Sequence, residues 1–202
     1  MAEIKSSDER RKEIIGAARQ LFIEKGYDAT STTDIMTAVG IAKGTLYYHF
    51  ASKEEILDAL IASITDDMAL RAAGAARDFS KSLVSRMVGV IKAMNVSSGG
   101  AADIVEKIHL PQNALLHQKS HTVTIQKIQP VMLELVNEGI ASGMFHTDYP
   151  DAAVHMALTY SIVGFDEPEA VDLDMIKGFV YNLERLLGAQ SGTLDEFFTL
   201  FG

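Results

Sequence analysis

The chain has 202 residues with no cysteine and no tryptophan, and 48% of its residues are hydrophobic and 22% charged. This composition is ordinary for a globular protein, and the length suffices for one good-sized domain or two small ones. The lack of cysteine excludes disulfides, thiolate zinc sites and cysteine nucleophiles, and it suits a cytoplasmic location. Because the polar N-terminal residues do not resemble a signal peptide and no apolar run reaches about 18 residues, we expect a cytoplasmic protein without a membrane partner.

The net charge of −9 is unevenly distributed along the chain. Residues 1–55 carry 8 basic and 9 acidic side chains, whereas residues 56–202 carry 10 basic and 18 acidic ones. The acidity therefore lies in the second part of the chain. The nearly neutral first part is compatible with a local basic face that binds nucleic acid.

Two helices are predicted in the first forty residues. Apolar residues recur at helical spacing over residues 8–25, and Gly26 supplies a C-terminal stop. Ser31 and Asp34 then form a variant of the capping box, which predicts the start of a short helix. This helix is expected to end at Gly40, which adopts a left-handed conformation without steric cost.

The stretch KGTLYYHF, residues 43–50, predicts a third short helix with three aromatic side chains. On a helix, Leu46 and Phe50 share one face, so we expect them to pack on the core. Tyrosine hydroxyls donate to phosphate oxygens, lysine neutralises phosphate, and glycine permits close approach to a base edge. The outward-facing residues, which suit a DNA surface better than a plain solvated one, are Lys43, Gly44, Thr45, Tyr47, Tyr48 and His49.

A full S-x-x-E capping box begins a long fourth helix at Ser52. The two short helices before it are joined by a tight glycine turn, which is the spacing of a helix-turn-helix. We therefore predict a DNA-binding domain at residues 1–55 and a second domain at residues 56–202.

Residues 26–57, GYDATSTTDIMTAVGIAKGTLYYHFASKEEIL, closely resemble the DNA-binding signature of the TetR family of bacterial one-component transcriptional regulators. Two positions depart from the family pattern. Val39 stands where alanine is commoner, and Ala42 stands where a serine commonly caps the recognition helix. Alanine accepts no capping hydrogen bond, at a typical cost of about 1 kcal/mol.

The resemblance implies which side chains contact DNA. Base readout is assigned to Lys43, Gly44 and Thr45, and phosphate contact to Tyr47, Tyr48, His49 and Lys53. Thr30 or Ser31 is expected to add a contact from the start of the second helix. Lys5, Arg10 and Arg11 are candidates for additional contacts from the N-terminal arm, although Lys5 also fits an unattached charged tail.

The remainder of the chain is also helical in pattern, so we predict an all-α fold with no strand. Helices are expected at residues 78–95, 101–109, 111–141, 151–165 and 168–187, with a short one at the end. The family resemblance implies that this part binds an effector and forms a homodimer through its last two long helices.

Two stripes are candidates for the dimer interface, with core packing as the alternative. Small residues form a ridge at Ala153, Ala157, Ser161 and Gly164. A facing stripe contains Met175, Phe179 and Leu183.

The resemblance implies an effector site among the helices of the second domain. Met87, Ile91 and Met94 form one candidate wall, because methionine adapts to varied apolar shapes. A second candidate wall contains His117, His121 and Thr124, which recur on one helical face. That face is a polar pocket wall, a solvated face or, with His109 or Glu106, a metal site. We predict no metal and no cofactor.

No catalytic motif is present, so we predict that the protein is not an enzyme. The expected function is a ligand-responsive regulator, a repressor that binds a palindromic operator as a homodimer and is released by a small, partly apolar effector. The alternative is a DNA-binding regulator of the same architecture that is controlled by a protein partner or a metal ion.

Overall fold

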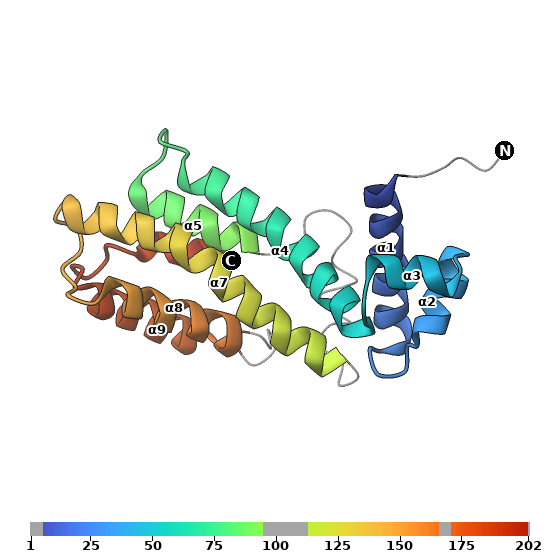
Figure 1. The fold of residues 1–202 in the computed structure, drawn as a ribbon. Helices are drawn as coiled ribbons and strands as arrows, with labels where there is room; N and C mark the ends of the chain where they lie inside the picture. Colours follow the sequence, from blue (N-terminus) through green and yellow to red (C-terminus); the bar gives the residue numbers. More distant parts are fainter. Residues whose placement is uncertain (1–5, 95–112, 166–170, 202) are drawn as a thin grey trace. The chain divides into compact units, whose positions relative to one another are not determined.

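The computed structural model of the chain describes residues 6–94, 113–165 and 171–201. Within these residues every regular element is helical, which confirms the predicted all-α fold (Figure 1). The elements are α1 (Ser7–Lys25), α2 (Thr32–Val39), α3 (Lys43–His49), α4 (Lys53–Ala76), α5 (Leu83–Met94), α7 (Ala114–Ala141), α8 (Pro150–Gly164), α9 (Leu173–Leu187) and a 3₁₀ helix, η3 (Asp195–Leu200). The helix predicted at residues 101–109 lies outside the described residues.

The described residues divide into two compact units. Unit 1 contains residues 6–65 and 113–120, and unit 2 contains residues 66–94, 121–165 and 171–201. The functional boundary between residues 55 and 56 stays a prediction.

In unit 1, helix α1 packs against both α2 and α3. The core between them is formed by fully buried apolar side chains, among them Phe22, Ile35 and Leu46. Arg11 on α1 adds a polar contact, since its Nη1 donates to the backbone oxygen of His49 at 2.8 Å. The three helices are therefore held together by a buried apolar core and by the hydrogen bond between Arg11 and His49.

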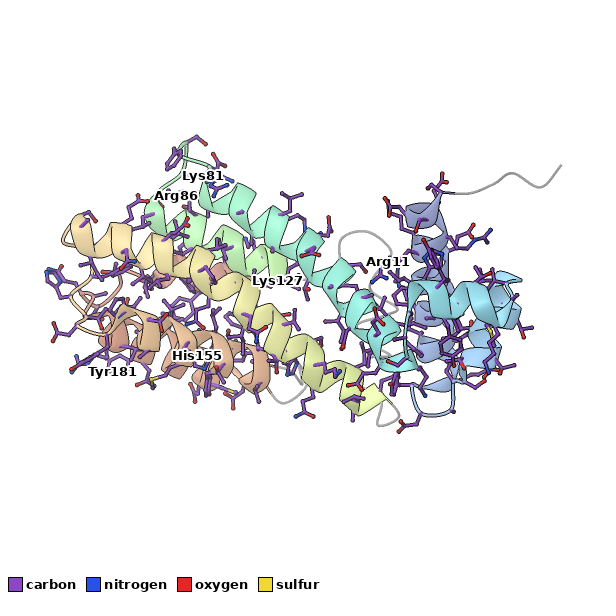
Figure 2. The ribbon with its side chains drawn as sticks, in the orientation of Figure 1. Arg11, Lys81, Arg86, Lys127, His155 and Tyr181 are labelled. Carbon is purple, nitrogen blue, oxygen red and sulfur yellow. The ribbon has the colours of Figure 1, made fainter. Side chains whose placement is uncertain are left out.

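In unit 2, the C-terminal η3 packs against α5 and α9. Phe197 in η3 and Leu194 just before it are both buried. The carboxylate of Glu184, itself buried, accepts the backbone N–H of Leu194 at 3.0 Å. Arg86, which Figure 2 labels, is also buried, and it forms an ion pair with Glu138 on α7. Charged side chains thus join segments of unit 2 that are far apart in sequence.

Two predicted helix starts were wrong, because local capping sites make the helices begin later in the chain than predicted. Helix α5 begins at Leu83, where the Ser82 hydroxyl accepts the N–H of Ser85 at 3.0 Å. Helix α9 begins at Leu173, where the Asp172 carboxylate accepts the N–H of Met175 at 2.7 Å. Among the described residues, no helix is both long and apolar enough to cross a membrane.

Candidate DNA-contacting surface

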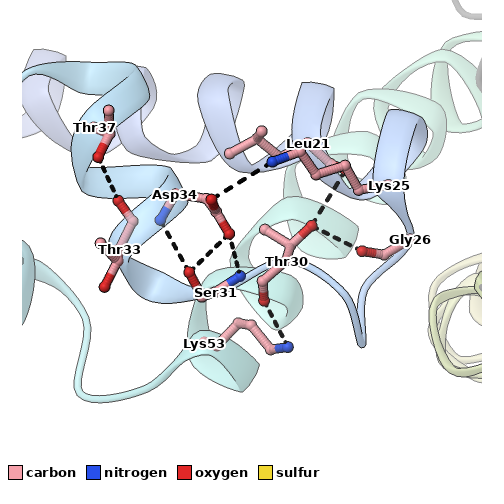
Figure 3. Close-up of polar contacts among 9 residues, drawn as sticks. All are labelled: Leu21, Lys25, Gly26, Thr30, Ser31, Thr33, Asp34, Thr37 and Lys53. Carbon is pink, nitrogen blue, oxygen red and sulfur yellow. Dashed lines mark hydrogen bonds and ion pairs between the residues drawn. The ribbon is translucent and has the colours of Figure 1, made fainter.

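Helix α2 begins at a reciprocal cap, as the sequence predicts (Figure 3). The Ser31 hydroxyl accepts the N–H of Asp34 at 3.1 Å, and the Asp34 carboxylate accepts the N–H of Ser31 at 2.8 Å. Donation by the Ser31 backbone and then by its hydroxyl lowers the pKa of Asp34. Gly40 ends the helix in the left-handed conformation with φ 71°, so the chain turns sharply into α3.

Helix α3 has one buried and one exposed face. Leu46 and Phe50 are each 1% exposed, whereas Tyr47 is 45% and Tyr48 79% exposed. This division follows from the spacing of four residues between Leu46 and Phe50. Lys43 and Gly44 are also exposed, and Thr45 and His49 are half-buried. Ala42 at the N-cap makes no side-chain capping bond, which confirms the expected missing cap.

The exposed face of α3 combines aromatic and cationic groups. The Lys43 ammonium lies 5.8 Å from the centroid of the Tyr47 ring, and the rings of Tyr48 and His49 meet edge to face at 5.0 Å. Lys43 makes no ion pair with any described residue. Such a face offers hydroxyl and ammonium donors to phosphate oxygens and ring surfaces to sugars and thymine methyl groups.

Thr30 requires a correction to the predicted DNA-contacting set. Its side chain is 1% exposed, and its hydroxyl donates to the backbone oxygen of Gly26 at 2.8 Å (Figure 3). We therefore remove Thr30 from the proposed contacts. Ser31 remains exposed beside it.

Lys53 is half-buried, and its ammonium is directed to backbone oxygens of unit 1. It donates to Tyr27 at 2.7 Å and to Thr30 at 2.8 Å. The carboxylate of Glu55, two residues later, accepts the backbone N–H of Ala51 at 2.6 Å. The Lys53 side chain is thus directed inward, whereas the side chains on the exposed face of α3 are directed outward.

The arm residues have internal partners too. Arg10 pairs with Glu13 on the same helix at 2.9 Å, and Arg11 binds the backbone of His49. Lys5 lies outside the described residues. The inward roles of Arg11 and Lys53 carried no signal in the sequence, because their partners are backbone oxygens distant along the chain.

The predicted effector residues lie on α5 and α7. Met87 and Thr124 are buried, and Ile91, Met94, His117 and His121 are half-buried. Buried positions of this kind fit core packing as well as a pocket wall, so the effector site stays a prediction. His109 and Glu106 lie outside the described residues. Among the described residues, no group of three or more side chains could hold a metal ion.

The predicted dimer residues are divided between the interior and the surface of unit 2. Ala153 and Leu183 are 2% and 6% exposed, so their side chains pack inside the unit, and we correct their assignment to the interface. Ala157, Ser161, Gly164, Met175 and Phe179 are half-buried. The exposed positions of α8 and α9 carry larger apolar residues that were not among the predicted interface residues: Met156, Tyr160, Val163, Leu173 and Tyr181.

Comparisons with known proteins agree with this geometry. Residues 14–60 match the family of bacterial regulatory proteins of the tetR type, and residues 93–173 match the tetracyclin repressor-like C-terminal domain. The transcriptional repressor KstR2 of Mycobacterium tuberculosis is 30% identical over 142 residues, covering 69% of this chain and 70% of that protein. The regulator UidR of Escherichia coli is 27% identical over 185 residues, covering 88% and 91%.

Solved structures share the fold. A TetR/AcrR-family regulator from Thermobifida fusca is 27% identical with a TM-score of 0.57, covering 89% of this chain and 96% of that chain. RolR in complex with resorcinol is 17% identical with a TM-score of 0.63, covering 95% and 93%, a likeness of fold alone. From these matches and the helix-turn-helix geometry, the chain belongs to the TetR family and is a DNA-binding transcriptional regulator.

Proposed function

We propose that this chain is a ligand-responsive transcriptional repressor that binds a palindromic operator as a homodimer. The observation that carries the DNA-binding part is the exposed face of α3. There Tyr47 and Tyr48 project beside Lys43, while buried Leu46 and Phe50 anchor the helix. Repression is supported by the similarity to KstR2, which is a repressor.

Exposed apolar side chains on α8 and α9 support the homodimer. Met156 and Val163 are each 59% exposed, and Tyr160 is 46% exposed, at three- and four-residue spacing on α8. Leu173 and Tyr181 extend the apolar surface on α9. A contiguous apolar face favours burial against a partner, and a second copy supplies a self-complementary one. Such a dimer reads two half-sites about 34 Å apart.

The proposed effector is small and partly apolar. RolR, which shares the fold, binds resorcinol, a small phenol. In our proposal the effector binds among helices of unit 2, where Met87 and Thr124 are buried and His121 is half-buried. The effector binds more tightly to a conformation of the dimer in which the spacing of the two recognition helices does not match the operator. Binding of the effector therefore shifts the dimer to that conformation and releases the DNA.

Operator binding tests the proposal directly. Fluorescence anisotropy with a palindrome from the gene's own promoter region is expected to detect tight binding at low salt. Tyr47→Ala is expected to weaken binding about tenfold or more, because it removes a contact on each half-site. Tyr149→Ala is the matched control, since Tyr149 is exposed in unit 2. Equal affinity of the Tyr47→Ala protein and the wild type contradicts the assignment of the surface.

Two further measurements separate the other parts of the proposal. Val163→Glu is expected to produce a monomer in sedimentation, because it puts a charge in the proposed interface. Titration of the operator complex with small phenols, resorcinol first, is expected to release DNA, and His121→Ala to alter that response without altering DNA binding. Intact DNA binding with no release by any small molecule favours control by a protein partner.

A further inference from the structure

The Lys53 ammonium makes three contacts inside unit 1. It donates to the backbone oxygens of Tyr27 and Thr30 at 2.7 and 2.8 Å. It also lies 4.2 Å from the centroid of the Tyr27 ring, a favourable cation–π distance. An ammonium has three donors, so two are used by carbonyls and the aromatic ring covers a third side of the group.

These contacts hold the start of α2. Tyr27 and Thr30 lie in the loop between α1 and α2, and the next residue, Ser31, is the N-cap of α2. Lys53 is the first residue of α4. The Lys53 side chain therefore joins the first turn of α4 to Tyr27 and Thr30, in the loop that leads into α2.

Arg11 makes an equivalent contact at the other end of the motif. Its Nη1 donates to the oxygen of His49, the last residue of α3, at 2.8 Å. Its guanidinium carbon lies 4.1 Å from the centroid of the Phe50 ring. The last carbonyls of a helix have no intrahelical partner and favour a cation, so Arg11 ties α1 to the end of the recognition helix.

We propose that Lys53 and Arg11 are positioning residues for operator binding, which hold α2 and α3 in the DNA-reading orientation and do not neutralise phosphate. The inference rests on the proposed operator binding. Lys43 provides the contrast inside the same motif, since it is exposed and forms no ion pair with any described residue.

The salt dependence of operator binding distinguishes a positioning cation from a phosphate contact. Each neutralised phosphate contributes about 0.9 to the slope of log affinity against log salt concentration. Lys43→Gln removes one exposed cation from the DNA-reading face of each subunit, whether that cation lies against a base edge or a phosphate. It is therefore expected to reduce the slope of a dimer by about 1.8. Lys53→Gln is expected to leave the slope at the wild-type value.

The same variants are compared for affinity and specificity. Lys53→Gln is expected to weaken operator binding about tenfold or more, the size of a lost base contact, because the recognition helix is misplaced. Affinity for unrelated DNA, which depends on phosphate charge, is expected to change less, so the ratio of operator affinity to unrelated-DNA affinity falls. Arg11→Gln is expected to behave in the same way.

Circular dichroism establishes that each variant is folded at the assay temperature, and Arg11→Gln carries the test if Lys53→Gln does not fold. A slope that falls in Lys53→Gln and Arg11→Gln as it does in Lys43→Gln overturns the inference, as does unchanged operator affinity in both. Failure of the wild-type protein to bind any operator instead contradicts the proposed function.

Discussion

The helix-turn-helix and unit 2 use their polar side chains for different purposes. On α3, Lys43, Tyr47 and Tyr48 are exposed, and Lys43 has no ion-pair partner in the described part of the chain. In unit 2, Arg86 and Glu184 are buried and bind groups on other segments. The comparison indicates that α3 keeps polar groups available for an external partner, whereas unit 2 uses them to hold its own segments together.

The largest expected effect separates the two faces of α3. Leu46→Ala is expected to lower the free energy of unfolding by about 3 kcal/mol, because a fully buried leucine leaves a cavity. Tyr48→Ala is expected to change it by less than about 0.5 kcal/mol, since Tyr48 is exposed. Urea denaturation at one fixed protein concentration measures both. Similar losses in the two variants contradict the division of α3 into an anchoring face and an exposed face.

The second prediction breaks the internal ion pair of unit 2. Glu138→Ala leaves the buried Arg86 guanidinium without its carboxylate partner, whose own side chain is 48% exposed, and is expected to cost about 2 kcal/mol of unfolding free energy. Adding Arg86→Met removes the buried charge and is expected to recover most of that loss. Glu134→Ala, an exposed position on the same helix, is the control in urea denaturation. A double variant no more stable than Glu138→Ala contradicts a structural role for the pair.

A third prediction restores the missing cap of α3. Ala42 has φ −75° and ψ 157°, close to the capping conformation of Ser31. Ala42→Ser is therefore expected to add about 1 kcal/mol to the unfolding free energy by accepting an N–H in the first turn. Thermal denaturation measures the gain, with Ser31→Ala as the reciprocal variant that loses about the same amount. A destabilised Ala42→Ser protein contradicts this view of the helix start.

The smallest expected effect concerns acid stability. The pKa of Asp34 is lowered in the folded state by donation from Ser31, so its carboxylate stabilises the fold above the unfolded pKa. That contribution is lost as pH falls through the folded pKa. Asp34→Asn is expected to flatten the acid side of the plot of unfolding free energy against pH. An identical pH dependence in the two proteins would show that the cap does not depend on this charge.

Much of the first fifty residues is predictable because their contacts are local. The Ser31–Asp34 cap, the turn at Gly40 and the burial of Leu46 and Phe50 depend on spacings of three or four residues along one segment. The exposed apolar residues of α8 and α9 were missed for the opposite reason. Helical spacing identified two stripes, but which stripe faced outwards depended on packing against neighbouring helices.

The sequence by itself therefore determined the all-α fold, the helix-turn-helix and the family, because these follow from periodicity, caps and a dense local motif. Only the tertiary structure decided that Thr30 is buried and that Lys53 and Arg11 face inward. The physical reason is that their partners are carbonyl oxygens on other segments. A backbone oxygen has no residue-type signature, so no spacing between side chains identifies it as the partner of a cation.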